Sequence, residues 1–176
     1  MQELELKFLL GKEAFYQQME AFARQYPHIA LRHRMQINYY YDTKDLLFHQ
    51  KWVTLRIRQT EGGLVWQEKA HTYADFAISE ETERPIETIP QEIVHQGQPV
   101  LLQGHLATHR TQFRLCDGLK IEWDRNFYCG ICDYEVEIEF DEGMEKDAQK
   151  LAEKFCFGGH NQQGKARRFY ERIYSR

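Results

Sequence analysis

Charged side chains recur at every second position in several segments, the spacing that places them on one face of a β-strand. Acidic examples are Glu3 and Glu5, and the run Glu135, Glu137 and Glu139. Carboxylates in such a row repel one another and gain nothing from solvent exposure. Hard divalent cations such as Mg²⁺ and Mn²⁺ take carboxylate oxygens as ligands. The acidic segments therefore predict a divalent-metal site between strands.

Basic side chains follow the same alternation in other segments. Arg56 and Arg58 share one strand face, and Lys7, Lys69 and Arg110 occupy equivalent positions elsewhere. Arginine forks suit the oxygens of a phosphate. A polyphosphate bridged to a metal would satisfy both the basic and the acidic segments.

Further charged residues also fall at this spacing: Glu81, Glu83, Arg114, Lys120, Glu122 and Asp124. A solvated sheet face with cross-strand ion pairs, each contributing about 1 kcal/mol at most, is the alternative interpretation. That interpretation suits one charged strand better than several. Charges inside and apolar residues outside instead predict an α+β protein: an antiparallel barrel with a charged lumen, covered outside by helices.

Length and composition favour one domain over residues 1–176. The 23 basic and 27 acidic residues give a net charge of −4, which argues against a general nucleic-acid or anionic-membrane binder. No segment reaches the roughly 18 apolar residues of a membrane span, and the N-terminus lacks the order of a secretory signal. We expect a cytoplasmic protein with four reduced cysteines.

Hydrophobic periodicity predicts the elements that position these side chains. Extended segments are expected at 3–10, 29–43, 52–60, 64–69, 76–84, 105–115, 119–127 and 133–141. Helices are expected at 12–26, 143–157 and 166–174, with a short helical pattern at 89–94. Cys129 and Cys132 fall where a hairpin turn is expected; a turn is favoured over a redox or metal pair.

Several segments together resemble a known family. They are Glu3-Leu-Glu5-Leu-Lys7, Tyr40-Tyr-Asp-Thr43, Leu55-Arg-Ile-Arg58, Trp66-Gln-Glu-Lys69, Glu81-Thr-Glu83 and Tyr134-Glu-Val-Glu137. In this order, and over nearly the whole chain, they resemble motifs of the triphosphate tunnel metalloenzymes. This group is also called the CYTH superfamily, after class IV adenylyl cyclase and thiamine triphosphatase.

The resemblance implies a closed eight-stranded antiparallel tunnel that requires Mg²⁺ or Mn²⁺ and acts on a triphosphate. By position, Glu3, Glu5 and Glu137 would hold the metal, with Glu135 and Glu139 close by. Other carboxylates would support these ligands or hold a second metal: Glu81, Glu83, Glu122 and Asp124.

The same resemblance implies phosphate contacts from Lys7, Arg56, Arg58, Lys69 and Arg110, and a tunnel mouth covered by Lys165. Members often carry Lys-x-Arg where this chain has Thr108-His109-Arg110. One phosphate contact is therefore missing or supplied by Arg114 or His109.

The resemblance further implies that Lys7 and Tyr40 orient or deprotonate the attacking water. Because Lys7 would sit among other cations, we expect its charged form to be disfavoured.

The expected activity is metal-dependent hydrolysis of a small triphosphate, namely inorganic tripolyphosphate, a nucleoside triphosphate or thiamine triphosphate. Two alternatives remain open. One is cyclase chemistry of the class IV type, and the other is a non-catalytic module that binds polyphosphate or nucleotide. A monomer or homodimer is expected, without nucleic-acid or membrane partners.

Overall fold

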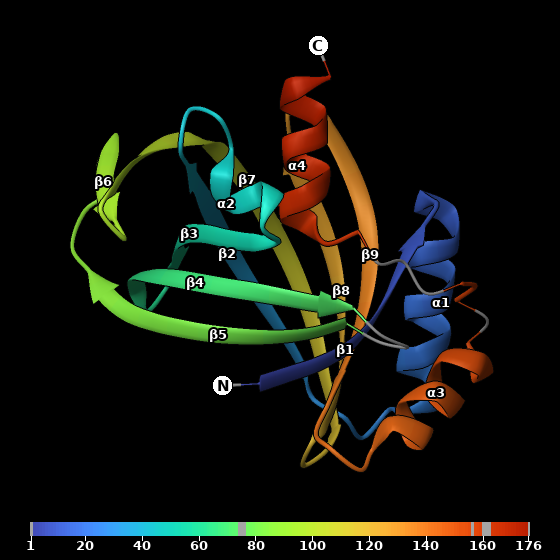
Figure 1. Ribbon diagram of the computed structural model, residues 1–176. Coiled ribbons are helices and arrows are strands. Elements are labelled where there is room, and N and C mark those ends of the chain that lie inside the picture. The colour runs from blue at the N-terminus through green and yellow to red at the C-terminus, as the bar shows by residue number, and fades with distance from the viewer. Residues whose placement is uncertain (1, 74–76, 156, 160–162, 176) are drawn as a thin grey trace.

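One antiparallel sheet dominates the computed structural model, which describes residues 2–73, 77–155, 157–159 and 163–175 (Figure 1). Its described strands are β1 (Gln2–Leu10), β2 (Leu31–Asp42), β3 (Val53–Thr60), β4 (Gly63–Tyr73), β5 (Ala77–Ile86), β6 (Glu92–His95), β7 (Gln98–Cys116), β8 (Leu119–Tyr128) and β9 (Ile131–Phe140). The described helices are α1 (Lys12–Gln25), α2 (Leu47–Gln50), α3 (Glu145–Lys154) and α4 (Lys165–Tyr174).

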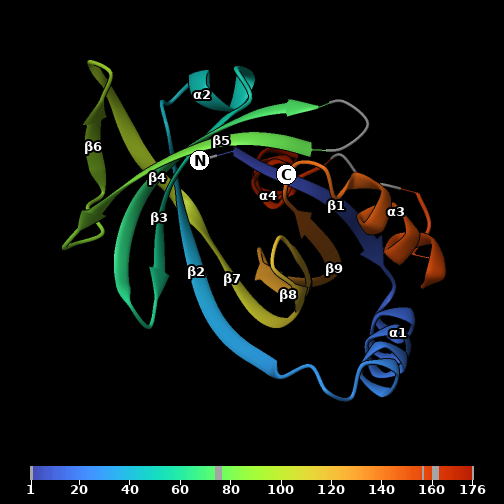
Figure 2. The same cartoon turned by 90° about the horizontal axis from the view of Figure 1, so that it is seen from below.

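Eight of these strands close on themselves. The order is β2-β3-β4-β5-β1-β9-β8-β7, and β2 also pairs with β7 to complete the ring, while β6 pairs with β7 outside it. All the pairings are antiparallel. Figure 2 shows the long strands β2 and β7 curving together along one side. The predicted closed eight-stranded antiparallel barrel is confirmed.

The segment around β6 differs from the sequence-based expectation. The prediction of a short helical segment at 89–94 was wrong, because residues 92–95 form a strand that turns back into β7. Gln96 and Gly97 make the turn with φ values of 49° and 74°, and two left-handed residues favour a tight hairpin. Ile93 and Val94 are β-branched or bulky residues that fit a pleated strand.

The main hydrophobic core lies between the outer wall of the barrel and two helices. Leu6 and Val136 are buried on the outward faces of β1 and β9. They belong to one cluster with Phe15 and Phe22 of α1 and Leu151 of α3. Aromatic rings reinforce this packing, as in the Phe22–Phe155 pair. Because the apolar residues alternate outward, the charged ones on the same strands face the interior.

α4 packs differently from α1 and α3. Its Phe169 and Tyr170 are buried against Tyr40, Leu106 and Tyr128, which lie on the inward faces of their strands. The rings of Tyr40 and Phe169 are 4.9 Å apart. Apolar side chains replace charged ones at this end of the interior, and Figure 1 shows α4 lying against that end of the barrel. Lys165, the first residue of α4, reaches the buried carboxylates Asp124, Glu135 and Glu137.

The close packing of α4 against β7 depends on a glycine of β7. Gly104 has φ +149°, and a Cβ at this position would lie 2.8 Å from Cζ of Phe169. We expect Gly104→Ala to lower the free energy of unfolding by about 1–3 kcal/mol, because the ring must move. Urea denaturation would measure it. An unchanged midpoint would show that α4 is not held at this contact.

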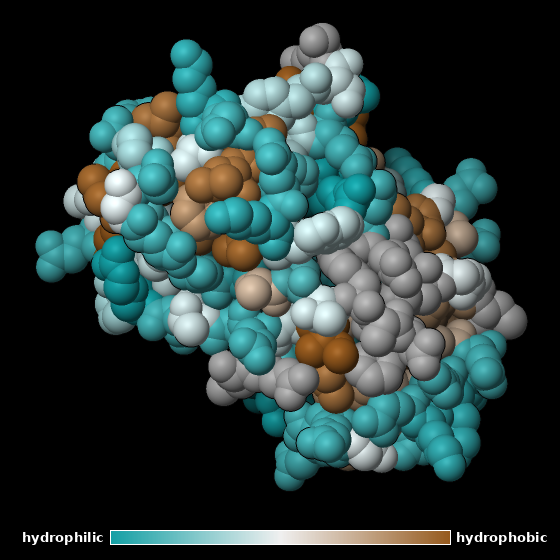
Figure 3. Space-filling model, in the orientation of Figure 1, coloured by the Kyte–Doolittle hydropathy of each residue, from teal (hydrophilic) through white to brown (hydrophobic). Residues whose placement is uncertain are grey.

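No helix among the described residues has both the length and the apolar character to cross a membrane. On the face shown in Figure 3, hydrophilic side chains predominate and hydrophobic ones form small separate groups.

Candidate functional site

A cavity of about 330 Å³ inside the barrel brings together both classes of charge. Its basic lining residues are Lys7, Arg56, Arg58, Lys69, Arg110, Lys165 and Arg167. Its acidic lining residues are Glu3, Glu5, Glu122, Glu137 and Glu139. The strands thus converge on one interior site, as the alternating charges predicted.

The register of β1 against its neighbours places lysines between glutamates. Lys7 lies opposite Glu137 on β9, and its Nζ is 2.8 Å from Oε1 of Glu5 and 3.3 Å from Oε1 of Glu137. Lys69 of β4 reaches Oε2 of Glu3 at 2.7 Å. Lys7 and Lys69 therefore each have partners of opposite sign, which offset the cost of burying their charges.

The protonation of Lys7 differs from the sequence-based expectation. Burial lowers its pKa, but Glu5, Glu137 and Glu135 outweigh that effect, so the pKa is raised above its ordinary value. The prediction of a disfavoured charge was wrong because Glu5 of β1 and the glutamates of β9 raise the pKa of Lys7 more than burial and Lys165 lower it. In this state Lys7 holds its proton at neutral pH.

Tyr40, the predicted companion of Lys7, lies beyond the cavity lining. It is completely buried, and its hydroxyl has no hydrogen-bond partner among the described residues. Burial raises its pKa, while Arg56 and Lys165 oppose the rise. The hydroxyl of Tyr40 therefore keeps its proton, although the cations Arg56 and Lys165 are nearby.

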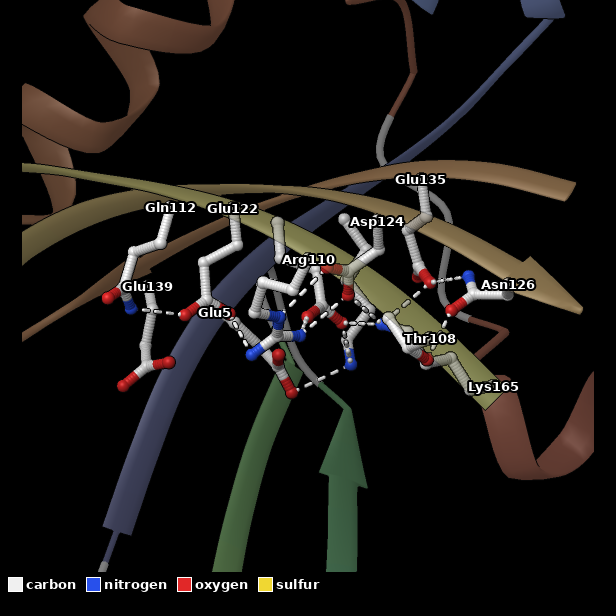
Figure 4. A network of polar contacts seen from close by, with 12 residues as sticks. Glu5, Thr108, Arg110, Gln112, Glu122, Asp124, Asn126, Glu135, Glu139 and Lys165 are labelled. Atoms are coloured by element: carbon white, nitrogen blue, oxygen red, sulfur yellow. Dashed lines mark hydrogen bonds and ion pairs between the residues drawn. The ribbon is translucent and has the colours of Figure 1, made fainter. Parts of the chain in front are cut away.

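Arg110 joins three carboxylates from β8 and β9 (Figure 4). Its guanidinium is 2.6 Å from Oδ2 of Asp124 and 2.6 Å from Oε2 of Glu137, and it also contacts Glu122. Burial lowers the pKa of Arg110, but these carboxylates raise it well above its ordinary value. Arg110 is thus already neutralised by the protein.

Lys165, at the start of α4, enters the same network from the covered end. Its Nζ lies 2.9 Å from Asp124, 2.9 Å from Glu135 and 2.8 Å from Glu137. Arg168 adds a second contact to Glu135 at 2.8 Å. Both cations are on α4, so the packing of this helix decides whether the carboxylates beneath it are neutralised.

The β3 wall carries an excess of positive charge. Arg56 donates to Gln67 at 2.7 Å and lies 3.5 Å from Glu81. Arg58 donates to Oδ1 of Asn38 at 3.1 Å. Burial and the neighbouring Arg56 lower the pKa of Arg58 to about 10. Adding an anion here would relieve this repulsion, so the wall suits a phosphate group.

Glu139 is the acidic lining residue whose charge is least favoured. Burial and the nearby Glu122 raise its pKa to about 7, although Lys120 approaches at 2.8 Å. A raised carboxyl pKa stabilises the fold below the unfolded value of 4.5, and this stabilisation is lost as pH rises to about 7.

We therefore expect the free energy of unfolding to fall between about pH 5 and 7 by about 1–3 kcal/mol through Glu139. Denaturation with chelator present would measure it, and Glu139→Gln should flatten the fall. An equal fall in the variant would assign the effect to other groups.

The acidic lining residues supply oxygen donors suited to Mg²⁺ or Mn²⁺. The described His, Cys, Asp and Glu side chains form no ready cluster of three or more for a metal. A protein cation, the Nζ of Lys7, lies between Glu5 and Glu137 instead. Glu5 and Glu137 already hold one positive charge, the ammonium of Lys7, between them. Their oxygens therefore fit a metal cation that displaces or joins Lys7.

Several predicted residues lie outside the cavity lining. Glu81 neighbours Arg56, and Glu83 accepts a hydrogen bond from Gln67 at 3.0 Å. Glu135 and Asp124 are buried in ion pairs beneath α4. Arg114 is exposed near the far end of β7, 3.7 Å from Asp117.

The two cysteines of the β8–β9 hairpin lie apart from the charged cavity. Cys129 and Gly130 form its turn with φ values of 49° and 78°. A tight turn with two left-handed residues is typical of such a hairpin, which favours the turn interpretation.

Sequence reasoning missed His71 and Arg168. His71 lines the cavity two residues after Lys69, so the same alternation could have found it. Its ring lies 3.1 Å from Oγ1 of Thr54, and burial with Lys69 and Lys7 lowers its pKa to about 3. His71 is thus neutral. No sequence pattern marks Arg168, which reaches Asp133 and Glu135 only because α4 docks on the barrel.

The sequence pattern of one protein family, described as the CYTH domain, matches residues 1–170. No curated protein shows significant sequence similarity to the chain.

Solved structures share the fold. A candidate adenylate cyclase from Bacillus halodurans aligns with TM-score 0.71 and 22% identity, over 96% of this chain and 97% of the other. A candidate adenylyl cyclase from Hippeastrum, with a dominant triphosphatase activity, aligns with TM-score 0.75 and 18% identity over 96% and 95%. The Mimivirus capping enzyme triphosphatase aligns with TM-score 0.55 and 12% identity over 89% and 88%.

Proposed function

Since the chain belongs to the CYTH domain family, we propose that it is a divalent-metal-dependent triphosphatase that hydrolyses a triphosphate bound inside the barrel. The observation that carries this proposal is an interior cavity that is lined both by cations suited to phosphate and by carboxylates suited to a metal. A site that bound only an anion would gain from fewer carboxylates. The combination favours a metal-bridged phosphate chain.

The cationic side chains would bind and neutralise the substrate. Arg58, whose positive charge is poorly compensated, and the adjacent Arg56 offer forked donors, and Lys69 offers an ammonium on the next strand. Phosphoryl transfer depends mainly on positioning and on neutralising charge over the phosphate oxygens. These residues would therefore supply much of the catalysis without a covalent step.

Glu3, Glu5 and Glu137 would hold the metal, with Glu139 beside them. When bound, Mg²⁺ or Mn²⁺ polarises phosphate oxygens and makes water a stronger nucleophile. Lys7 keeps its proton. It would therefore donate to a substrate or water oxygen and orient it, and its predicted use as a base is not favoured in this protonation state.

The test is turnover by the purified protein. Tripolyphosphate, ATP and thiamine triphosphate would each be supplied with Mg²⁺ or Mn²⁺, and phosphate, pyrophosphate and cyclic AMP would be scored. We expect phosphate release from at least one substrate and its loss with a chelator. Cyclic AMP with pyrophosphate would instead assign the cyclase reaction. Tight tripolyphosphate binding without turnover would assign a binding module.

A further inference from the structure

Two arginines extend the inward face of β2 beyond the cavity. Gln36 lines the cavity and is buried, whereas Arg34 and Arg32 follow at alternate positions and are exposed. Because alternate residues of a strand share a face, all three lie on the inward face. Arg32 is eight residues from Tyr40, roughly 26 Å along the strand at about 3.3 Å per residue. The pair therefore marks the barrel end opposite α4.

The register with β7 joins this end to the candidate site. Arg34 lies opposite Arg110, which lines the cavity, and Arg32 lies opposite Gln112. A second cavity of about 330 Å³ is lined by Arg32, Gln112 and Arg114, together with His28, Ile29, Ala30 and Leu115. Basic side chains thus continue outward from Arg110, which lines the interior cavity.

Charge compensation changes sharply along this path. Arg110 contacts three carboxylates. Within the described ranges, Arg32 and Arg34 have no ion pair, and Arg114 has only a 3.7 Å contact with the fully exposed Asp117. An uncompensated group of arginines at a tunnel mouth attracts anions and binds phosphate oxygens well.

We propose that Arg32, Arg34 and Arg114, here called the mouth arginines, bind phosphate units of a linear inorganic polyphosphate that extends out of the barrel. This inference rests on the proposed function, which places one end of the phosphate chain in the interior cavity. Among the described residues that line the second cavity there is no Phe, Tyr or Trp on which a nucleobase could stack. The arrangement therefore favours a bare phosphate chain over single-stranded nucleic acid.

The test compares Arg32→Gln/Arg34→Gln with the wild type. A matched control, Lys12→Gln/Arg24→Gln, removes two positive charges from exposed positions of α1. Steady-state hydrolysis would be measured on tripolyphosphate and on long-chain linear polyphosphate. We expect Arg32→Gln/Arg34→Gln, here called the mouth variant, to raise KM for the long-chain polyphosphate about tenfold, or about 1.4 kcal/mol, and to leave kcat/KM for tripolyphosphate unchanged. The control variant should change neither value. Equal effects on both substrates, or none, would overturn the proposal.

Equilibrium binding of labelled long-chain polyphosphate provides a readout independent of turnover. If the proposed hydrolysis fails, weaker binding to the mouth variant would still support the mouth arginines, and unchanged binding would contradict them. Unlabelled tripolyphosphate and orthophosphate distinguish a chain from separate phosphate ions. Equally strong competition by a single-stranded oligonucleotide would assign a general polyanion surface and reject the proposal.

Discussion

Replacing Arg58 by alanine is expected to lower kcat/KM for the triphosphate about 10²–10³-fold while the barrel stays folded. The magnitude is that of losing one preorganised donor to a charged transition state. Arg58 lines the cavity, and burial together with repulsion from the neighbouring Arg56 lowers its pKa to about 10, so its charge is disfavoured. The variant loses a phosphate contact but also loses this repulsion. We therefore expect its free energy of unfolding to stay within about 1 kcal/mol of the wild type.

Two measurements separate this result from general damage. Metal-dependent phosphate release gives the loss of activity, and a thermal melt shows whether the fold survives. Arg24→Ala is the matched control, because Arg24 is an exposed arginine of α1 whose ion pair with Glu20 is on the surface. Near wild-type turnover in Arg58→Ala would remove Arg58 from the phosphate site.

The alternation of charged residues was enough to predict a closed barrel with a charged interior. Alternation is a local property: once Glu3, Glu5 and Lys7 share a face, every neighbouring strand must offer a matching face. The hydrophobic packing between the outer wall of the barrel and α1 could also be predicted, since α1 carries Phe15 and Phe22 at helical spacing. The predicted cavity residues therefore met because strand pairing leaves them few other arrangements.

The ion-pair partners of the buried charges and the docking position of α4 could not be predicted from local sequence patterns. The pKa of Lys7 depends on Glu137, 130 residues away in sequence, and on the register between β1 and β9. α4 has an amphipathic pattern that says which face is apolar but not which surface receives it. Its insertion over Tyr40 brings Lys165 onto Glu137. Such non-local contacts decide protonation, and no local pattern records them.

The largest effect on metal dependence is expected from Glu5→Gln. Glu5 is almost completely buried, and its carboxylate lies 2.8 Å from Nζ of Lys7 and 3.6 Å from Nζ of Lys69. Glutamine keeps the shape but removes the negative charge that a hard cation requires. We expect metal-supported turnover to fall about 100-fold or more, a loss typical of weakened metal binding.

A metal titration distinguishes this loss from misfolding. If Glu5 holds the ion, a higher Mg²⁺ or Mn²⁺ concentration restores part of the rate, whereas a damaged fold gives no recovery. Removing one partner of a buried ion pair costs up to about 3–5 kcal/mol, so assays should be run well below the melting temperature. Glu80→Gln is the matched control, since Glu80 is an exposed glutamate of β5. If Glu5→Gln needs no more metal than this control, Glu5 is not a ligand, and its role is to keep Lys7 charged.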